Sequence, residues 1–161
     1  MYRRILLAYD GSVGAWEALR AAVALAREGG AALTALSIEA HLPHYAATVG
    51  EVEKEREAEE RACRRWLAEA AAYAGEEKVP IETLTCAGHP AQVITRVAAE
   101  RAVDLVVIGH SGHSRAWGHF LGGVTEKVGR HAPCSVLIVR ELPAASASEA
   151  ATLPPPAMPS A

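Results

Sequence analysis

The chain has few aromatic residues, no excess of basic charge and no long apolar segment. Half of its 161 residues are hydrophobic but only 5% are aromatic, so a core must be built mainly from alanine and aliphatic side chains. The net charge of −3 excludes the basic surface that duplex DNA or an anionic membrane requires. No run approaches the roughly 20 consecutive apolar residues that span a bilayer. We expect one globular domain with no nucleic-acid or membrane partner.

The cysteines are too few and too scattered for a disulfide framework. Cys63, Cys86 and Cys134 are odd in number and form no CxxC pair, which is typical of small buried hydrophobes in a reducing compartment. The N-terminal sequence MYRRILLAYDG has an apolar run that ends at Asp10, which is too short for a secretory signal. We therefore expect a cytoplasmic protein.

Two common nucleotide-binding motifs are missing. The chain has no GxxxxGK[ST], so it lacks a Walker-type phosphate loop and its lysine. No GxGxxG follows the first expected strand, so a dinucleotide fingerprint is missing too.

Short aliphatic runs alternate with longer segments of helical periodicity. The runs predict strands at 4–9, 31–40, 79–88, 104–109 and 134–140. Between them we expect helices over 12–29, about 51–73, 90–102 and about 124–131. Because the strands read as hydrophobic on both faces, this order predicts a parallel sheet with helices on each side.

The ends and faces of these helices carry specific signals. Ser12 is a candidate N-cap, Gly29-Gly30 is a candidate stop, and Pro90 suits a first helical position. In the second helix, Glu57 with Arg61 and Glu60 with Arg64 have the spacing of i,i+4 ion pairs on a solvated face. The predicted buried stripe of that helix is Ala62, Trp66, Ala70 and Tyr73.

Composition changes abruptly near residue 142. Residues 142–161 contain five of the nine prolines, together with alanine and serine, and almost no large apolar side chain. We predict a folded domain over 1–141 and a disordered tail over 142–161. An alternative role for LPPPAMP is that of a polyproline ligand.

Polar and glycine residues follow the first and fourth expected strands. In an open parallel sheet, ligands bind at the carboxyl ends of the strands, where the strand order reverses. If the order is 3-2-1-4-5, Asp10 and Gly109 face each other there. Gly122–Thr125 forms a backbone nest at a helix start, which suits phosphate. The alternative is a glycine-bearing connection with an ordinary helix start.

Four segments share the order and spacing of one known family. GHSGHSRAWGHFLGG has a G-x2-G-x9-G spacing, ILLAYDGS lies near the start, GHPAQVI precedes the third helix, and GGVTEKVGRHAPCSVLIVR lies near the end. Over residues 2–140 the chain resembles the universal stress protein (UspA-like) family, and the glycine spacing is that of its ATP-binding branch.

The resemblance implies a flavodoxin-like, adenine nucleotide alpha hydrolase-like α/β fold that binds ATP, or AMP or ADP, with Mg²⁺ or Mn²⁺. It also implies a homodimer formed through the last strand, residues 134–140. Asp10 would lie at the ribose and the metal-bound phosphates, and the backbone of Ile38 would meet adenine. The nucleotide-binding set carried over to this chain is Ala8, Tyr9, Asp10, Ser12, Ile38, Ile108, Gly109, His110, Gly112, His113, Gly122, Gly123, Val124 and Thr125, with Asp10 as candidate metal ligand.

One position departs from the family pattern. A hydroxyl residue normally follows the third glycine, and this chain has Gly123 there. The hydrogen bond that such a hydroxyl makes to phosphate is worth roughly 1.5–3 kcal/mol. Thr125, two positions further on, is a candidate replacement.

Three other functions compete with nucleotide binding. His110 and His113 form an HxGH pair like that of adenylyl-transferring enzymes, although in those enzymes the pair follows the first strand. His110, His113 and His119 are a candidate zinc set, without a cysteine or carboxylate at suitable spacing. The third alternative is an interaction protein that has lost nucleotide binding, for which Gly123 argues. No nucleophile or general base stands out, so any ATP hydrolysis should be slow.

Overall fold

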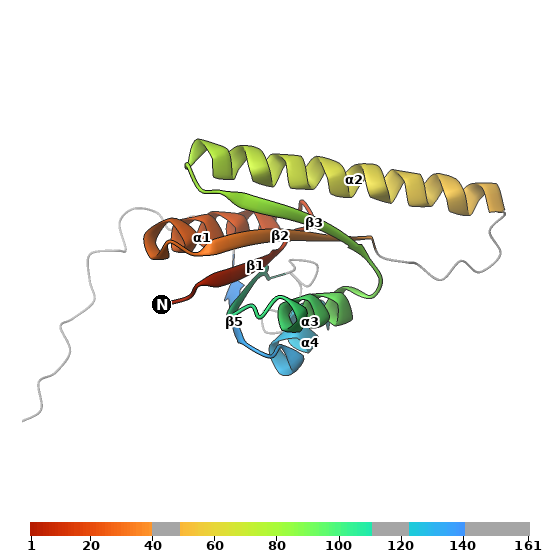
Figure 1. The fold of residues 1–161 in the computed structure, drawn as a ribbon. Coiled ribbons are helices and arrows are strands. Elements are labelled where there is room, and N and C mark those ends of the chain that lie inside the picture. Colours follow the sequence, from red (N-terminus) through yellow and green to blue (C-terminus); the bar gives the residue numbers. More distant parts are fainter. Residues whose placement is uncertain (40–48, 111–122, 141–161) are drawn as a thin grey trace, which may run out of the picture.

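The fold is an open α/β sandwich around a five-stranded parallel sheet. A computed structural model describes residues 1–39, 49–110 and 123–140. The strand order is β3-β2-β1-β4-β5, which confirms the predicted 3-2-1-4-5 order (Figure 1). The elements in chain order are β1 (Arg4–Ala8), α1 (Val13–Gly29), β2 (Ala32–Glu39), α2 (Val49–Glu76), β3 (Ile81–Ala87), α3 (Pro90–Glu100), β4 (Leu105–Gly109), α4 (Gly123–His131) and β5 (Ser135–Val139).

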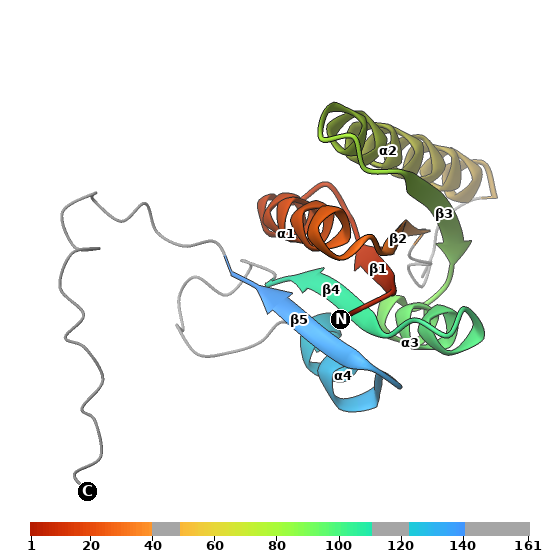
Figure 2. The same cartoon turned by 60° about the vertical axis from the view of Figure 1, so that its left-hand side comes forward.

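Helices cover both faces of the sheet. Figure 2 shows α1 and α2 on one face and α3 and α4 on the other. Successive residues of β1 point to opposite faces, so Ile5 and Leu7 enter the core under α1 and α2, whereas Leu6 enters the core under α3 and α4. This explains why β1 reads as one continuous aliphatic run. No helix in the described part of the chain is both long and apolar enough to cross a membrane.

Three predicted helix-end signals, at Ser12, at Gly29-Gly30 and at Pro90, are confirmed. The hydroxyl of Ser12 caps α1 by accepting the Ala15 N–H at 3.2 Å. Gly30 ends α1 in the left-handed conformation, with φ of 61°. Pro90 occupies the first turn of α3, where its missing N–H breaks no helical hydrogen bond.

Helix α2 differs most from its prediction. It extends to Val49–Glu76, and Figure 1 shows its N-terminal turns reaching beyond the strands. The predicted buried stripe was wrong by about one position for most members. The buried row is Cys63, Leu67, Ala70 and Ala74, while Ala62, Trp66 and Tyr73 are half-buried beside it. Small residues at 70 and 74 let the helix approach the sheet closely, which displaces the aromatic rings to the side. The ion pairs of Glu57 with Arg61 and of Glu60 with Arg64 are confirmed.

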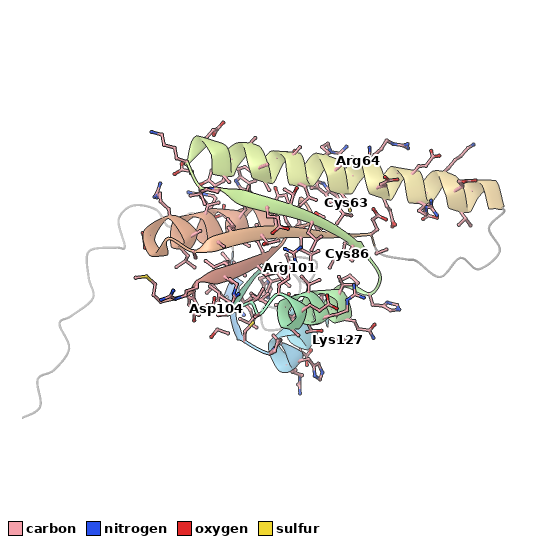
Figure 3. All side chains as sticks on the ribbon, viewed as in Figure 1. Cys63, Arg64, Cys86, Arg101, Asp104 and Lys127 are labelled. Atoms are coloured by element: carbon pink, nitrogen blue, oxygen red, sulfur yellow. The ribbon has the colours of Figure 1, made fainter. Side chains whose placement is uncertain are left out.

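The two edge strands are less buried than the sequence predicted. All four residues of β4 from Leu105 to Ile108 are buried, but β3 and β5 alternate between half-buried and exposed residues. On β3, Glu82 pairs with Arg101 at 2.7 Å, and Figure 3 labels that arginine near the lower face of the sheet. On β5, Leu137 is 37% exposed. The expectation of strands hydrophobic on both faces therefore holds for the centre of the sheet and fails at its edges, where only one neighbouring strand and fewer helices cover the side chains.

The three cysteines are free thiols on separate elements. Cys63 is buried on α2, whereas Cys86 on β3 and Cys134 before β5 are half-buried (Figure 3 labels the first two). Burial raises the pKa of the Cys63 thiol, and nearby Glu39 and Glu59 add to the effect. The prediction of buried thiols is therefore confirmed for Cys63 and wrong for Cys86 and Cys134, which lie half-buried against the core under α3 and α4.

Helix α1 begins directly on the end of β4. A Cβ atom added to Gly109 would lie 2.3 Å from the carbonyl carbon and oxygen of Gly14. A Cβ atom added to Gly14 would lie 2.6 Å from the carbonyl oxygen of His110. Two backbones therefore touch without an intervening side chain, which only glycine allows. From the sequence, Gly109 was predicted to face Asp10 at the ligand edge of the sheet; the close contact shows that it also permits helix packing.

Replacing Gly109 with alanine should push α1 away from β4, because the new methyl group meets backbone rather than a movable side chain. We expect a loss of about 1–3 kcal/mol in the free energy of unfolding, measured by urea titration. Gly123→Ala is the control, since no described atom lies within 4 Å of its added Cβ. Equal unfolding midpoints for the two variants would contradict the close contact.

Candidate functional site

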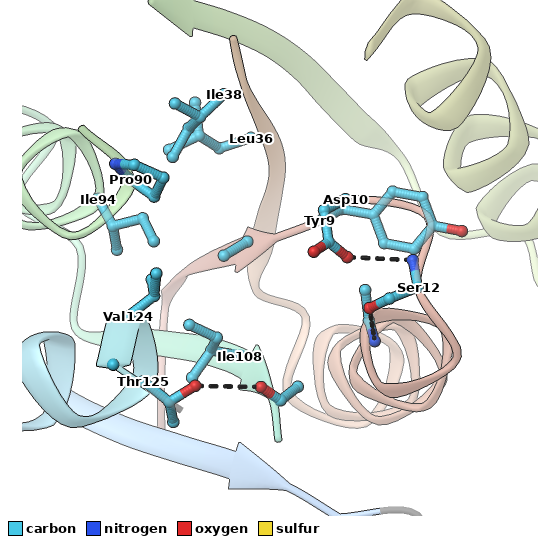
Figure 4. Close-up of a pocket in the computed structure, with 14 residues that line it drawn as sticks. Tyr9, Asp10, Ser12, Leu36, Ile38, Pro90, Ile94, Ile108, Val124 and Thr125 are labelled. Atoms are coloured by element: carbon cyan, nitrogen blue, oxygen red, sulfur yellow. Dashed lines mark hydrogen bonds between the residues drawn. The ribbon is translucent and has the colours of Figure 1, made fainter. Parts of the chain in front are cut away.

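A cavity of about 310 Å³ opens at the carboxyl edge of the sheet (Figure 4). It lies where β1 meets β4, the point at which the chain reverses the direction of strand addition. The residues that line it come from the ends of three strands and the starts of three helices. They are Ala8, Tyr9, Asp10, Ser12, Ala15, Leu36, Ile38, Pro90, Ile94, Ile108, Gly109, Gly123, Val124 and Thr125.

Most of the predicted site residues meet at this cavity. Those that line it are Ala8, Tyr9, Asp10, Ser12, Ile38, Ile108, Gly109, Gly123, Val124 and Thr125. His110 is not among the lining residues, and its backbone N–H donates to the carbonyl of Val139 at 2.7 Å. Gly112, His113 and Gly122 lie outside the described residues.

Four lining residues were not predicted as site residues: Ala15, Leu36, Pro90 and Ile94. Leu36 precedes Ile38 by two positions and so shares its face of β2. Ile94 follows Pro90 by one helical turn, at the start of a helix that begins at the same edge of the sheet. Leu36 and Ile94 could therefore have been predicted from the residue spacing of β2 and α3, once both elements were placed at this edge.

One side of the cavity is apolar. Leu36, Ile38 and Ile94 face Ile108 across it, and Pro90 closes its outer end (Figure 4). Ser37 is fully buried, and its hydroxyl donates to the carbonyl of Tyr9 at 2.6 Å. That bond ties the end of β2 to the residue after β1. The apolar side suits a flat, weakly polar group.

The other side of the cavity is polar and carries Asp10. One carboxylate oxygen of Asp10 accepts the backbone N–H of Ser12 at 3.0 Å. In Figure 4 the carboxylate points toward the cavity, which leaves its second oxygen facing the cavity. Asp10 is the only charged side chain among the described residues that line the cavity. It can accept hydrogen bonds or coordinate a hard cation.

Thr125 has a structural partner. It is 1% exposed, and its hydroxyl donates to the carbonyl of Gly109 at 3.3 Å. A threonine hydroxyl has one proton to donate, so in this arrangement the proton is not offered to a phosphate oxygen. The bond instead ties the first turn of α4 to the end of β4. Thr125 is therefore a poor substitute for the hydroxyl that Gly123 lacks.

Tyr9 lines the cavity, but it belongs to the core under α1 and α2. It is 2% exposed and packs with residues of α1 and α2 rather than with those of α3 and α4. Burial, reinforced by the charges of Glu69 and Asp10, raises the pKa of Tyr9 to about 12. The phenol therefore stays protonated near neutral pH and cannot serve there as a base.

The histidine hypotheses fall mainly on residues that are not described. Of the candidate zinc ligands, His113 and His119 lie outside the described residues, and the HxGH pair shares His113. Within the ranges 1–39, 49–110 and 123–140, no three His, Cys, Asp or Glu side chains converge to hold a metal ion.

Comparisons with known proteins agree with the fold. The profile of the universal stress protein family matches residues 1–140. A universal stress protein of Thermus aquaticus is 38% identical over 141 residues, which cover 87% of this chain and 100% of its own.

Two solved structures are similar in three dimensions. The universal stress protein UspA from Lactobacillus plantarum has a TM-score of 0.78 and 27% identity, over 86% of this chain and 98% of its own. A universal stress protein in complex with cAMP has a TM-score of 0.68 and 27% identity, over 86% of this chain and 97% of its own. On the match of the profile over residues 1–140 and the identity to the Thermus aquaticus protein, this chain belongs to the universal stress protein family.

Proposed function

We propose that this universal stress protein binds an adenine nucleotide in the cavity at the β1–β4 junction, with ATP and a divalent cation as the main ligand. AMP or ADP would occupy the same place, and the bound protein would have a regulatory or protective role under stress in the cytoplasm. The observation that carries the proposal is the division of one cavity into an apolar side and a side that bears a single carboxylate. A family member that is 27% identical was solved with cAMP, which supports an adenine nucleotide.

The apolar side suits the base. Leu36, Ile38 and Ile94 offer aliphatic surface on which a purine ring can pack, and the backbone at Ile38 offers polar groups at the rim. The cavity volume of about 310 Å³ lies at the lower end of the range of small-molecule sites, roughly 300–1,000 Å³. A nucleoside therefore occupies it, and the phosphates extend toward its mouth.

The start of α4 suits the phosphates. The backbone N–H groups in its first turn, at Gly123, Val124 and Thr125, have no partner inside the helix, and the helix dipole favours negative charge there. Gly109 lies beside them at the end of β4. Gly112 and Gly122, with the G-x2-G-x9-G spacing, would complete the cradle.

The charge of the site favours a divalent cation together with ATP. A triphosphate would place several negative charges near Asp10, whose carboxylate repels them. Asp10 would hold Mg²⁺ or Mn²⁺, since both ions prefer oxygen ligands, and the positive charge of the ion would offset that repulsion. A nucleotide with fewer phosphates needs the cation less.

We propose binding rather than rapid turnover. The side-chain oxygen of Ser12 accepts the hydrogen bond that caps α1, and the Tyr9 phenol stays protonated. Neither is poised to activate a water molecule or a second substrate, so hydrolysis of ATP should be slow at most.

Asp10→Asn should weaken binding of MgATP by about tenfold, or 1.4 kcal/mol, because it removes the charge that holds the cation. The asparagine oxygen can still accept the Ser12 N–H, so the turn is kept. The change for AMP in EDTA should be smaller. Isothermal titration calorimetry measures both affinities. Glu126→Gln is the matched control, since Glu126 pairs with Arg130 on α4 and does not line the cavity. Undiminished MgATP affinity in Asp10→Asn would contradict the assigned site.

Gly123→Ser should strengthen binding of MgATP by about tenfold, because it adds a hydroxyl donor beside the phosphates. No described atom lies within 4 Å of the added Cβ, and Gly123 does not have a positive φ. Gly123→Ala is the control, since it adds the same Cβ without a hydroxyl. If calorimetry gives serine and alanine the same affinity, phosphate does not lie at this helix start.

We further propose a homodimer formed through β5. This edge strand carries no charged residue between Ser135 and Val139, whereas the opposite edge strand β3 carries the ion-paired Glu82. An uncharged edge offers unpaired backbone groups to a second copy, and natural proteins normally block such edges with charge. The exposed Leu137 would be covered in the dimer.

Leu137→Glu should convert the dimer to a monomer, because two new carboxylates would meet near the symmetry axis. Sedimentation equilibrium at micromolar concentration measures the mass. Thr83→Glu, an exposed position on the opposite edge strand, is the control and should stay dimeric. A wild-type protein that sediments as a stable monomer rules the dimer out.

A further inference from the structure

The turn that presents Asp10 is covered by a tryptophan from a helix outside the cavity. Gly11 has a φ of +70°, and a Cβ atom added to it would lie 2.2 Å from Cδ1 and Nε1 of Trp66. The indole edge therefore lies against the Cα of Gly11, in the place that a side chain would take. Trp66 is on α2, and no described residue of α2 lines the cavity.

The turn needs such support. Its centre is a glycine in the left-handed region, the residue type with the greatest conformational freedom in the absence of packing. Within the turn, the Asp10 carboxylate accepts the Ser12 N–H, and Ser12 then caps α1. Both bonds lie at exposed or half-buried positions, where water competes with them.

Trp66 is itself held in a fixed position. It is half-buried and packs against the core shared by α1 and α2. A second aromatic contact, between Trp16 of α1 and Tyr73 of α2, has ring centroids 5.2 Å apart and joins the same two helices. The indole thus packs against the core as well as against the turn, so its position does not depend on Gly11 alone.

We propose that Trp66 is a positioning residue of the nucleotide site: its indole braces the turn at Gly11 so that the Asp10 carboxylate faces the cavity before the ligand arrives. This inference rests on the proposed function. Without the brace the turn samples other conformations, and the ligand must select the binding-competent fraction, which lowers the apparent affinity by that fraction. By linkage, a bound nucleotide also stabilises the contact of α2 with the turn.

Calorimetric titration of Trp66→Ala with MgATP tests the inference. We expect affinity to fall about 5- to 20-fold, within the usual range of coupling between sites. Trp66→Phe, which keeps a ring against Gly11, should recover most of it. Leu67→Ala is the control for general stability. Leu67 follows Trp66 directly on α2, is buried, and packs in the same core. It should lower the urea midpoint and leave the affinity within twofold of the wild type.

A double-mutant cycle separates positioning from a merely structural role. If Trp66 acts by placing the Asp10 carboxylate, then Trp66→Ala should weaken binding by less than twofold in an Asp10→Asn background. Amide hydrogen exchange gives the reciprocal measurement: MgATP should slow exchange in α2 near Trp66 in the wild type and not in Trp66→Ala.

The outcomes are distinguishable. Equal affinity of Trp66→Ala and wild type, or additive effects with Asp10→Asn, overturns the positioning role of Trp66 and leaves the proposed function standing. Loss of affinity in Leu67→Ala as large as in Trp66→Ala does the same, because stability would then explain both. A wild-type protein that binds neither MgATP nor AMP overturns the proposed function itself.

Discussion

The direct contact between the first turn of α1 and the end of β4 is the constraint on which the site depends. Gly14 and Gly109 meet backbone to backbone, so the helix start lies at the level of the strand end. Asp10 and Ser12, just before the helix, are thereby held beside Gly109 and the first turn of α4. With side chains at these two positions, the helix would stand further off and the polar side of the cavity would open. A crevice at the switch point of a parallel sheet thus becomes a cavity with a defined width.

Much of the fold could be predicted because local signals agreed with the global arrangement. The aliphatic run of β4 is buried on both faces, as a central strand requires. Ser12 and Pro90 identified helix starts because each satisfies a backbone need that arises only there. The carboxyl-edge rule then brought Asp10 and Gly109 together, although they are far apart in the sequence, and the family resemblance added Ile38.

The rest depended on geometry that composition does not encode. The buried row of α2 is shifted because close approach to the sheet selects Ala70 and Ala74, and a periodic pattern cannot weigh small side chains against large ones. The contact of Trp66 with Gly11 joins α2 to the turn before α1, and how far α2 is shifted along the sheet relative to that turn is set by packing. Thr125 is the clearest example. Its position near the helix start suggested a hydrogen bond to phosphate, but its hydroxyl donates to a backbone carbonyl.

The bond from Thr125 to Gly109 has a consequence for sequence variation. It joins the last residue of β4 to the first turn of α4, so the two anchor points of the intervening segment are fixed by the sandwich itself. The bond does not depend on the identity or the number of the residues between the two anchors. The sequence between residues 110 and 124 could therefore change among related proteins while β4 and α4 keep their places, because the bond between Thr125 and Gly109 holds both anchor points together.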